Sequence, residues 1–482
     1  MQNEAQKLSI REKIGYGLGD TASNLFFQTF IFYLLYFYTD VFGISAAAAG
    51  TMFLVTRFWD AVNDPMMGAI ADRTDSQWGK FRPYLLWAAV PFGIFGVLMF
   101  TTPTLSPMGK LIYAYVTYTL MMMIYTVINV PYSALMGVVT PNSNDRTVVS
   151  SFRFVEAFIG MFIVQYFVLK MVDKFGGGNE AVGWQRAMAV LSGLAVLLFL
   201  VAFVSTKERV RPPKGQKNPL RRDLADLFTN SPWLLIGGAT VFQLIYVVIR
   251  SGNIMYYFEY YLKDQQVMLF GQTHSFTFKE LATAFMLIGT IVTILGAIMT
   301  KWISRLFGKP YTYVGFLAVS GIATGFFYFL EPGSLIPLFA LQLIGSFALG
   351  PVSVLQWAIY TDTADYSEWK NGRRATGLIM AASLFALKLG IALGGTILAW
   401  ILAGYGYRPN MEQTPGALQG IRLSMSLYPA LFALVGAGLM VFYPLGKKMM
   451  TIIETDLIER RKQYEQEEIP ELEGAIPCPG QE

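Results

Sequence analysis

Apolar runs of about 20 residues recur along almost the whole chain, separated by short polar segments. A run of this length crosses the hydrocarbon core of a bilayer as an α-helix, whereas the strands of a membrane barrel alternate over about ten residues. Only 14% of the 482 residues are charged, against about 25% in a typical soluble domain. We therefore predict an all-α polytopic membrane protein with about twelve transmembrane helices. The helices are expected at roughly residues 15–41, 46–70, 84–102, 111–140, 150–173, 186–206, 233–262, 278–304, 311–331, 335–362, 375–403 and 423–445.

Lysine and arginine gather in alternate loops, and this asymmetry predicts the orientation of the chain. Both residues are concentrated at the N-terminus, after the second and tenth predicted spans, in the central segment and in the C-terminal tail. The intervening loops are poor in both. Because cytoplasmic loops carry such an excess, we expect a multi-pass protein of the cytoplasmic (inner) membrane with both termini in the cytoplasm.

The polar central segment divides the chain into two halves of six predicted helices each. An internal repeat supports the division, because GAIADRTDSQWGKFRP and GAIMTKWISRLFGKPYTY each carry a Gly-Lys pair, Gly79-Lys80 and Gly308-Lys309, shortly after GAI. Two parallel halves related by an axis along the membrane normal produce such a repeat. The expected units are an N-terminal half at 1–206, a cytoplasmic central loop at 207–232, a C-terminal half at 233–446 and a cytoplasmic tail at 447–482.

Few residues of the chain are suited to catalysis or to soft metals. It has one cysteine, Cys478, in the tail, and one histidine, His274, in a predicted loop. A nucleophile–base pair or a Cys/His metal site at membrane depth is therefore not expected, and we predict neither an enzyme nor a cofactor. The net charge of +5 follows the topology of the loops and does not indicate nucleic acid. The expected partners are the bilayer and a small-molecule substrate, and we expect a monomer.

Two aspartates one helical turn apart, Asp60 and Asp64, interrupt the second apolar run. A carboxylate at the centre of a membrane helix costs about 2.5–3.5 kcal/mol on insertion scales, so the pair indicates a function. The spacing places both on one helix face with Asn63 beside them. Their oxygens suit a small hard cation or a shared proton, and the alternative is a structural ion pair with Arg57. The pattern favours a cation-coupled carrier.

Two polar stripes lie within predicted membrane helices, and a third group lies in the tenth span. One interpretation is that the two stripes face a hydrated cavity and bind a polyhydroxylated solute. The alternative is that they form hydrogen bonds between helices. Planar hydrogen-bonding side chains next to aromatic rings suit a sugar. The members are Asp20, Asn24 and Gln28 in the first span, Tyr125 and Asn129 in the fourth, and Trp357 in the tenth.

Charged residues also occur in the fifth and eleventh predicted spans. Arg153 and Glu156 have the spacing of an intrahelical ion pair, and Lys388 interrupts an apolar run. The acidic and basic residues within the predicted membrane spans are thus about equal in number. Binding or release of one cation would therefore change the net charge of this group of residues. At the cytoplasmic ends we expect ion pairs to close a gate between the loops 71–83 and 363–374. The gate residues would be Asp72, Arg73, Lys80, Asp365, Glu368 and Arg373.

Five motifs together resemble one known family. They are YTDVFG at the end of the first span, RFWDAVNDPMMG in the second, DRTDSQWGKFRPYLLW after it, YTVINVPYSAL in the fourth, and DTADYSEWKNGRRATG after the tenth. The family is that of the glycoside–pentoside–hexuronide:cation symporters of the major facilitator superfamily, which includes the melibiose carrier. The resemblance covers roughly residues 8–450. It implies twelve helices, alternating access, and sugar uptake driven by Na⁺, Li⁺ or H⁺.

The resemblance also implies which residues bind the two solutes. Its cation site falls on Asp60, Asn63, Asp64 and Thr126, with Na⁺ at Asp60 and Asp64. Tyr125, Arg153 and Lys388 match the family's sugar site, so the sugar-binding set becomes Asp20, Asn24, Gln28, Tyr125, Asn129, Arg153, Trp357 and Lys388. Four positions depart from the melibiose carrier, which has two sugar-binding aspartates and two aromatic residues there: Asn24, Asn129, Ser133 and Ser353.

These departures shift the expected substrate away from α-galactosides. Asparagine still donates and accepts hydrogen bonds, but it removes negative charge. The pocket would then accept a hexuronide paired with Arg153 or Lys388, or equally a neutral pentoside, and the motifs are nearer to the xyloside and glucuronide carriers. We predict cation-coupled symport of a glycoside, pentoside or hexuronide. The alternative is a major-facilitator carrier of a non-sugar solute or lipid.

Overall fold

A computed structural model describes residues 8–140, 143–209, 229–269, 272–372, 376–453 and 455–459. The side chains of Arg57, Asp60 and Asp72 lie outside what it describes, and so does Arg373 as a whole. Statements below refer to the described part of the chain.

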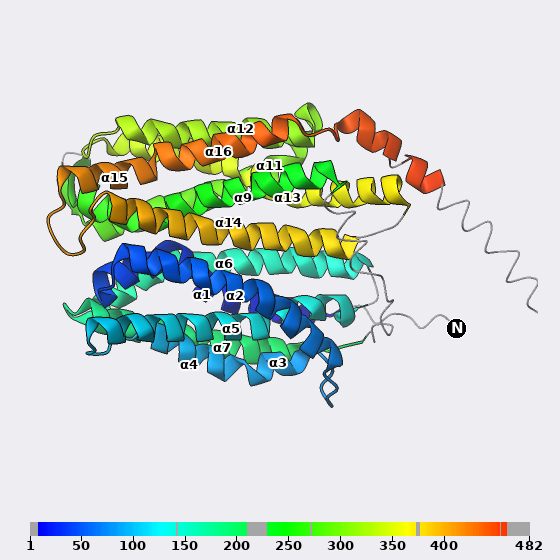
Figure 1. Ribbon diagram of the computed structural model, residues 1–482, viewed down its shortest axis with the longest axis horizontal. Helices are drawn as coiled ribbons and strands as arrows, with labels where there is room; N and C mark the ends of the chain where they lie inside the picture. The colour runs from blue at the N-terminus through cyan, green and yellow to red at the C-terminus, as the bar shows by residue number, and fades with distance from the viewer. Residues whose placement is uncertain are drawn as a thin grey trace, which may run out of the picture.

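The chain forms two bundles of helices that lie side by side (Figure 1). The first bundle contains α1 (Ile10–Tyr36) with its π-helical continuation η1 (Phe37–Phe42), α2 (Ala46–Arg73), α3 (Arg82–Trp87), α4 (Ala89–Met99), α5 (Pro107–Val139), α6 (Ser143–Gly176) and α7 (Glu180–Ser205). The second contains α9 (Ser231–Gly252), α10 (Ile254–Tyr256), the π-helical η2 (Tyr257–Leu262), strands β1 (Gln265–Leu269) and β2 (Gln272–Phe276), α11 (Phe278–Phe307), α12 (Lys309–Gly325), the 3₁₀ turn η3 (Phe326–Phe329), α13 (Leu335–Asn371), α14 (Thr376–Gly404), α15 (Pro415–Met425) and α16 (Leu427–Val441).

Each of the twelve predicted spans corresponds to one helix or to two or three consecutive helical elements. Ten helical segments of the described chain are long and apolar enough to cross a membrane. The other two spans are α2, whose apolar part is Ala46–Thr56, and the α3–α4 pair, whose apolar part is Ala89–Met99. The polar second half of α2 is the stretch that carries the aspartate pair. The all-α polytopic fold is therefore confirmed.

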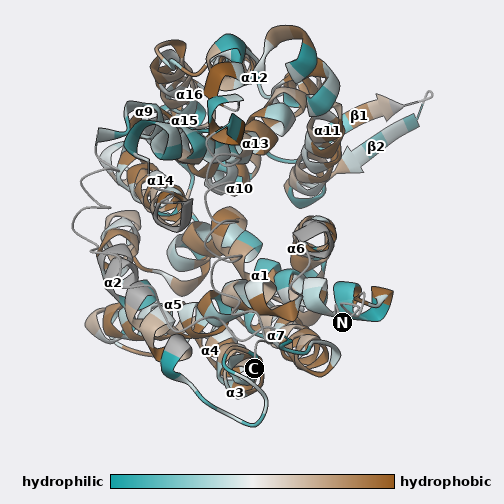
Figure 2. Ribbon diagram, turned by 90° about the vertical axis from the view of Figure 1, so that its right-hand side faces the viewer, coloured by the Kyte–Doolittle hydropathy of each residue, from teal (hydrophilic) through white to brown (hydrophobic). Residues whose placement is uncertain are grey.

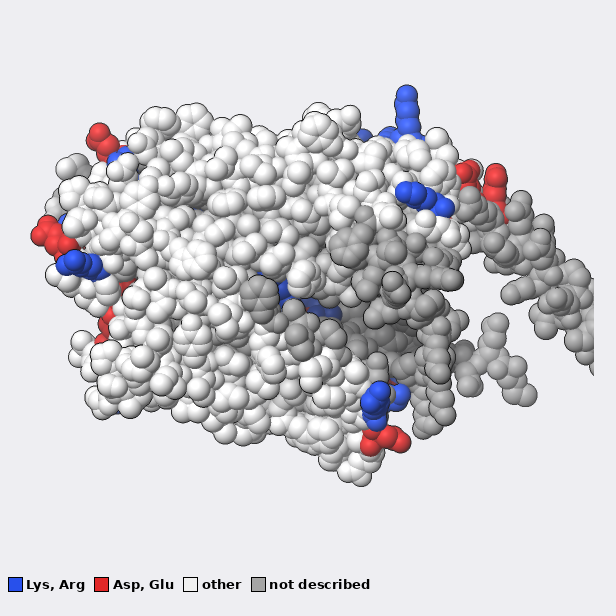
Figure 3. Space-filling model, in the orientation of Figure 1, with Lys and Arg blue, Asp and Glu red and all other residues white. Residues whose placement is uncertain are grey.

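Apolar side chains face outward along the middle of both bundles. Val190 in the middle of α7 is 50% exposed and Leu295 in the middle of α11 is 51% exposed, as expected for residues that contact lipid rather than water. Figure 2 shows hydrophobic residues spread over the outer helices. In Figure 3 most charged side chains of the visible face lie near the two ends of the molecule, and a blue patch lies in the seam between the bundles. This charge-poor middle band is the part that the bilayer would surround.

Glycines allow the helices within a bundle to approach closely. A Cβ at Gly350 of α13 would overlap the Thr293 carbonyl of α11, and one at Gly296 of α11 would overlap the Phe347 carbonyl of α13. Small residues at such crossings bring backbones together where no hydrophobic effect favours helix association in lipid. The α11–α13 pair is thereby fixed inside the second bundle.

A short antiparallel hairpin, β1–β2, connects η2 to α11, where a loop was predicted. His274 lies on β2 opposite Val267 and not in a loop. The hairpin is only five residues per strand, which is too short for the alternation to stand out in the sequence. It projects from the second bundle beside α11 (Figure 2). We call this end of the molecule the hairpin end, and the opposite end, where α2, α7 and α13 finish, the termini end.

The two bundles are joined most firmly at the hairpin end. Asp40 of η1 accepts hydrogen bonds from the hydroxyls of Tyr260 and Tyr407, the second at 2.5 Å. Asn410 Nδ2 donates to the Asp40 carbonyl at 2.6 Å. The Thr39 hydroxyl lies 2.7 Å from that of Tyr256. These residues, which we call the Asp40 seal, join a turn of the first bundle to three segments of the second.

Candidate functional site

Asp64 of α2 lies where the two bundles meet. Thr126 Oγ1, from α5 of the same bundle, donates a hydrogen bond to Asp64 Oδ1 at 2.9 Å. The Lys388 ammonium, from α14 of the other bundle, forms an ion pair with Asp64 Oδ2. The Asp64 side chain is 25% exposed, so a solute can reach it. One carboxylate thus connects a hydroxyl of its own half to a cation of the opposite half.

Asn63 adds a further polar group next to this pair. Its amide nitrogen is buried and has no hydrogen-bond partner among the described residues. The carboxylate of Asp64, the hydroxyl of Thr126 and the amide oxygen of Asn63 are hard oxygen donors of the kind that Na⁺ and similar cations accept. The Asp60 side chain, predicted to complete the set, lies outside the description. The structure therefore brings together Asp64 and Thr126, two of the four residues predicted for the cation, and adds Lys388 as a counter-ion, while Asn63 is the chain neighbour of Asp64 on α2.

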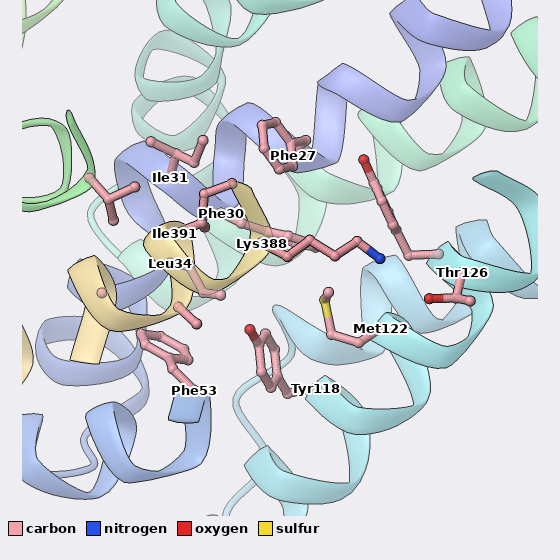
Figure 4. A pocket seen from close by; sticks show the side chains of 14 residues that line it. Phe27, Phe30, Ile31, Leu34, Phe53, Tyr118, Met122, Thr126, Lys388 and Ile391 are labelled. Atoms are coloured by element: carbon pink, nitrogen blue, oxygen red, sulfur yellow. The ribbon is translucent and has the colours of Figure 1, made fainter. Parts of the chain in front are cut away.

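A cavity opens beside Asp64 and extends between the two bundles (Figure 4). It has about 770 Å³ of space free of protein atoms, part of it open to solvent. Thr126 and Lys388 border it, and the Lys388 side chain extends along it toward Thr126 in Figure 4. Its remaining walls are aromatic and aliphatic, and the aromatic members are Phe27, Phe30, Phe53, Tyr118 and Tyr125. Flat rings of this kind suit the apolar faces of a pyranose.

The residues predicted for the sugar lie in different places. Tyr125 and Lys388 line the cavity. Trp357 of α13 is partly buried and packs against the core of the second bundle, with its ring centroid 6.1 Å from that of Tyr360.

Asp20 and Arg153 form a second charged centre inside the first bundle. The guanidinium of Arg153 binds both oxygens of Asp20, one of them at 3.1 Å. Tyr132 lies beneath the guanidinium at 5.1 Å and stacks on Tyr16 at 4.8 Å. The intrahelical pair predicted between Arg153 and Glu156 is not the arrangement found, because Asp20 of α1 lies closer to the guanidinium than the next turn of α6.

The amide side chains of α1 and α5 are hydrogen-bonded within the first bundle. Gln28 Nε2 donates to Asn24 Oδ1 at 3.2 Å, and Asn24 Nδ2 donates to the Asp20 carbonyl at 2.9 Å. Asn129 Oδ1 accepts from Ser23 at 2.8 Å. The first two bonds lie within α1 and the third joins α1 to α5. All three leave each amide some unused capacity for a solute.

Sequence reasoning found Tyr125 but missed the other aromatic residues of the cavity wall. Phe27 and Phe30 are spaced three residues apart on α1, and Tyr118 precedes Tyr125 by two helical turns on α5. These spacings were visible, but such residues occur equally often on lipid-facing surfaces of membrane helices. Only the packing of α1, α2 and α5 against α9 and α14 shows that they face one cavity.

The residues predicted for the cytoplasmic gate lie on separate bundles. Arg73 ends α2 and Lys80 lies in the loop after it, whereas Asp365 and Glu368 lie on the last turns of α13. The backbone of Lys80 is held within its own bundle, because its N–H donates to Glu208 at 2.9 Å. The side chains of Asp72 and Arg373 are outside the described part. An ionic gate between the two loops stays a prediction.

Comparison with known proteins places the chain in a family. A model described as MFS/sugar transport protein matches residues 15–447. The inner membrane symporter YicJ of Escherichia coli is 39% identical over 90% of this chain and 91% of its own length. The isoprimeverose transporter of Lactiplantibacillus pentosus is 33% identical over 92% and 91%. The fold resembles an inward-facing bacterial homologue of the lysosomal transporter Spinster, with 14% identity, a TM-score of 0.65, and coverage of 90% of this chain and 95% of that one. The chain therefore belongs to the MFS/sugar transport protein family, as a sugar symporter of the glycoside–pentoside–hexuronide type.

Proposed function

We propose that this symporter imports a neutral glycoside or pentoside together with Na⁺, and that Asp64 couples the two solutes. The observation that carries the proposal is the position of Asp64 between Thr126 of one half and Lys388 of the other. The hairpin end would face outward and the termini end the cytoplasm, in accord with the distribution of Lys and Arg.

Lys388 explains how an ion and a sugar can assist each other. Lys388 of one half neutralises Asp64 of the other. A cation held by Asp64, Thr126 and the Asn63 amide oxygen displaces the ammonium, because two positive charges compete for one carboxylate. The released ammonium remains in the cavity wall, where it can donate to a sugar hydroxyl. Ion binding then favours sugar binding, and by reciprocity sugar binding favours the ion.

The aromatic wall of the cavity favours a neutral sugar over a hexuronide. Its rings suit the apolar faces of a pyranose and offer no countercharge for a carboxylate. Arg153 is engaged by Asp20, so a uronate that binds there would have to break a partly buried pair and leave a charge uncompensated. The Lys388 ammonium that the cation releases can donate to a neutral hydroxyl. One relative, an isoprimeverose transporter, accords with this choice.

Transport in proteoliposomes tests the proposal. Uptake of labelled isoprimeverose, a glucuronide and an α-galactoside would be compared with and without an inward Na⁺ gradient. We expect isoprimeverose to be taken up fastest and only with the gradient. Faster uptake of the glucuronide would refute the neutral substrate, and equal uptake under a proton gradient alone would refute Na⁺.

Substitution at Asp64 tests the coupling site. Asp64→Asn should lower Na⁺-driven uptake about 30- to 100-fold, which corresponds to about 2–3 kcal/mol for a pair that is only partly shielded from solvent. Asp75→Asn removes the same charge from an exposed loop position of the same half and serves as the control. If Asp64→Asn keeps the Na⁺ dependence of the unmodified protein, the ion does not bind there. Thr126→Val should weaken Na⁺ coupling while it spares any coupling to H⁺, which needs only a carboxylate.

A further inference from the structure

A second cavity lies at the termini end of the second bundle, away from the transport site. The end of α11, the start of α12, α13 and the segment after α16 enclose about 980 Å³ of space free of protein atoms, part of it open to solvent. Its polar lining consists chiefly of Ser304, Arg305, Lys309, Asp362, Lys447 and Thr451. Three basic side chains thus face a space that holds one acid.

The single acid is already neutralised. Lys309 Nζ donates to both oxygens of Asp362, at 2.7 and 2.8 Å, and the Asp362 side chain is 9% exposed. Arg305 and Lys447 have no acidic partner among the described residues. The described lining of the cavity therefore carries an excess of about two positive charges, which attracts an anion.

The internal repeat shows what occupies the corresponding place in the first bundle. Gly79-Lys80 precedes α3 as Gly308-Lys309 begins α12. In the first bundle the carboxylate of Glu208, which follows α7, accepts hydrogen bonds from the N–H groups of Lys80, Phe81 and Arg82 at 2.9, 2.7 and 2.9 Å. An anion supplied by the chain itself thus sits at the start of the third span.

Among the described residues of the second bundle, no carboxylate holds the start of α12 in this way. No side chain caps the start of α12, and the segment after α16 contributes Lys447 to the cavity, whereas the segment after α7 contributes Glu208 to the start of α3. The N–H group of Lys309, a residue that lines the cavity, has no hydrogen-bond partner among the described residues. Where the first bundle carries its own carboxylate, the described part of the second places this N–H group beside three cations. An external anion would satisfy both.

The rim of the cavity indicates that this anion belongs to a lipid. Trp302, Phe307 and Tyr311 lie on the same two helix ends and are strongly exposed, Tyr311 to 75%. Aromatic residues of this kind line the boundary between acyl chains and water. Basic pockets at this depth on the cytoplasmic side bind anionic head groups. We propose that the cavity binds the phosphate of an anionic phospholipid of the inner leaflet, with Arg305 and Lys447 as its principal contacts and the exposed rings beside its acyl chains.

Lipid retention by the purified full chain tests the assignment. The protein is equilibrated with equal amounts of phosphatidylglycerol and phosphatidylcholine, and the lipids that remain bound are counted by native mass spectrometry. We expect the unmodified protein to retain phosphatidylglycerol selectively. Arg305→Gln with Lys447→Gln should weaken retention about 30-fold, since each basic residue near an anionic surface contributes about a factor of five.

A matched pair of substitutions provides the control. Lys301→Gln with Lys448→Gln removes two charges from the same segments, but neither residue lines the cavity. Equal loss of phosphatidylglycerol in both double variants would show a diffuse charge effect and overturn the proposal. A parallel arm measures the melting temperature with inorganic phosphate or glycerol phosphate. If either stabilises the protein as much as phosphatidylglycerol at equal concentration, the site takes a soluble phosphate and the lipid assignment is wrong.

Discussion

The Asp40 seal permits a quantitative prediction about the outward-facing and inward-facing states. Asp40 accepts hydrogen bonds from Tyr260 and Tyr407, which both belong to the opposite bundle. These bonds exist only while the bundles touch at the hairpin end. Asp40→Ala removes both and should therefore destabilise the closed hairpin end relative to its open form.

The size of the effect follows from the bonds that are lost. A hydrogen bond to a charged group contributes about 1.5–3 kcal/mol. The lower value applies here because water reaches the released hydroxyls once the bundles part. Two bonds then amount to about 3 kcal/mol, or roughly a 150-fold change in the ratio of the two states. Asp40→Asn retains an acceptor oxygen and should shift the ratio by about 1 kcal/mol, roughly five-fold.

Spin labels across the hairpin end can measure this ratio. Cys478 is the single cysteine of the chain, so Cys478→Ser gives a background for labels at Met108 and Ile336. These residues lie at the starts of α5 and α13 and are 66% and 87% exposed. Pulsed electron double resonance should show a longer distance gaining population in the order unmodified, Asp40→Asn, Asp40→Ala.

A charge control separates the seal from general electrostatics. Glu331→Gln removes an exposed carboxylate from the hairpin end of the second bundle, and it should leave the distances unchanged. The helix content of each variant is checked by circular dichroism. If folded Asp40→Ala keeps the distance distribution of the unmodified protein, the seal does not hold the bundles together.

Two further changes test the packing within each bundle. Gly350→Ala places a Cβ against the Thr293 carbonyl and should lower stability by about 1–3 kcal/mol, measured as a lower melting temperature in detergent. The control Gly137→Ala places a Cβ that meets no atom within 4 Å and should leave the melting temperature unchanged. Equal effects of the two substitutions would contradict the close α11–α13 contact. Glu208→Gln weakens three charge-assisted hydrogen bonds at the start of α3 and should lower the stability of that helix turn by about 1–2 kcal/mol. The loss should appear as faster hydrogen exchange at the amides of the turn. Unchanged exchange would contradict the capping role of Glu208.

The course of the membrane helices could be predicted from the sequence because it depends on local properties. Twenty apolar residues must form a helix in lipid wherever they occur in the chain. The polar interval of α2 was equally visible as a functional signal. The hairpin β1–β2 was not, because five-residue strands give too few alternations to distinguish them from a loop.

The ion-pair partners of the charged residues could not be predicted from the sequence. Lys388 and Asp64 are separated by 324 positions, and their pairing depends on how α14 packs against α2. Arg153 has an acid one turn away on its own helix, yet it binds Asp20 on another. Helical spacing gives the neighbours within one helix, whereas the partner in space is set by the arrangement of several. The cavity wall formed by Phe27 and Phe53 was hidden for this reason too.

The π-helical turns at the hairpin end affect how that end can open. The first span of each half ends in one, Phe37–Phe42 in η1 and Tyr257–Leu262 in η2, and each contains a carboxylate, Asp40 and Glu259. A π turn holds about one residue more than an α turn, so its return to α geometry advances the helix register by one position and rotates the residues concerned by about 100°. Such a rotation would carry Asp40 out of reach of its tyrosines. The hairpin end can thus be unlocked by a local change of winding, before the long helices tilt at all.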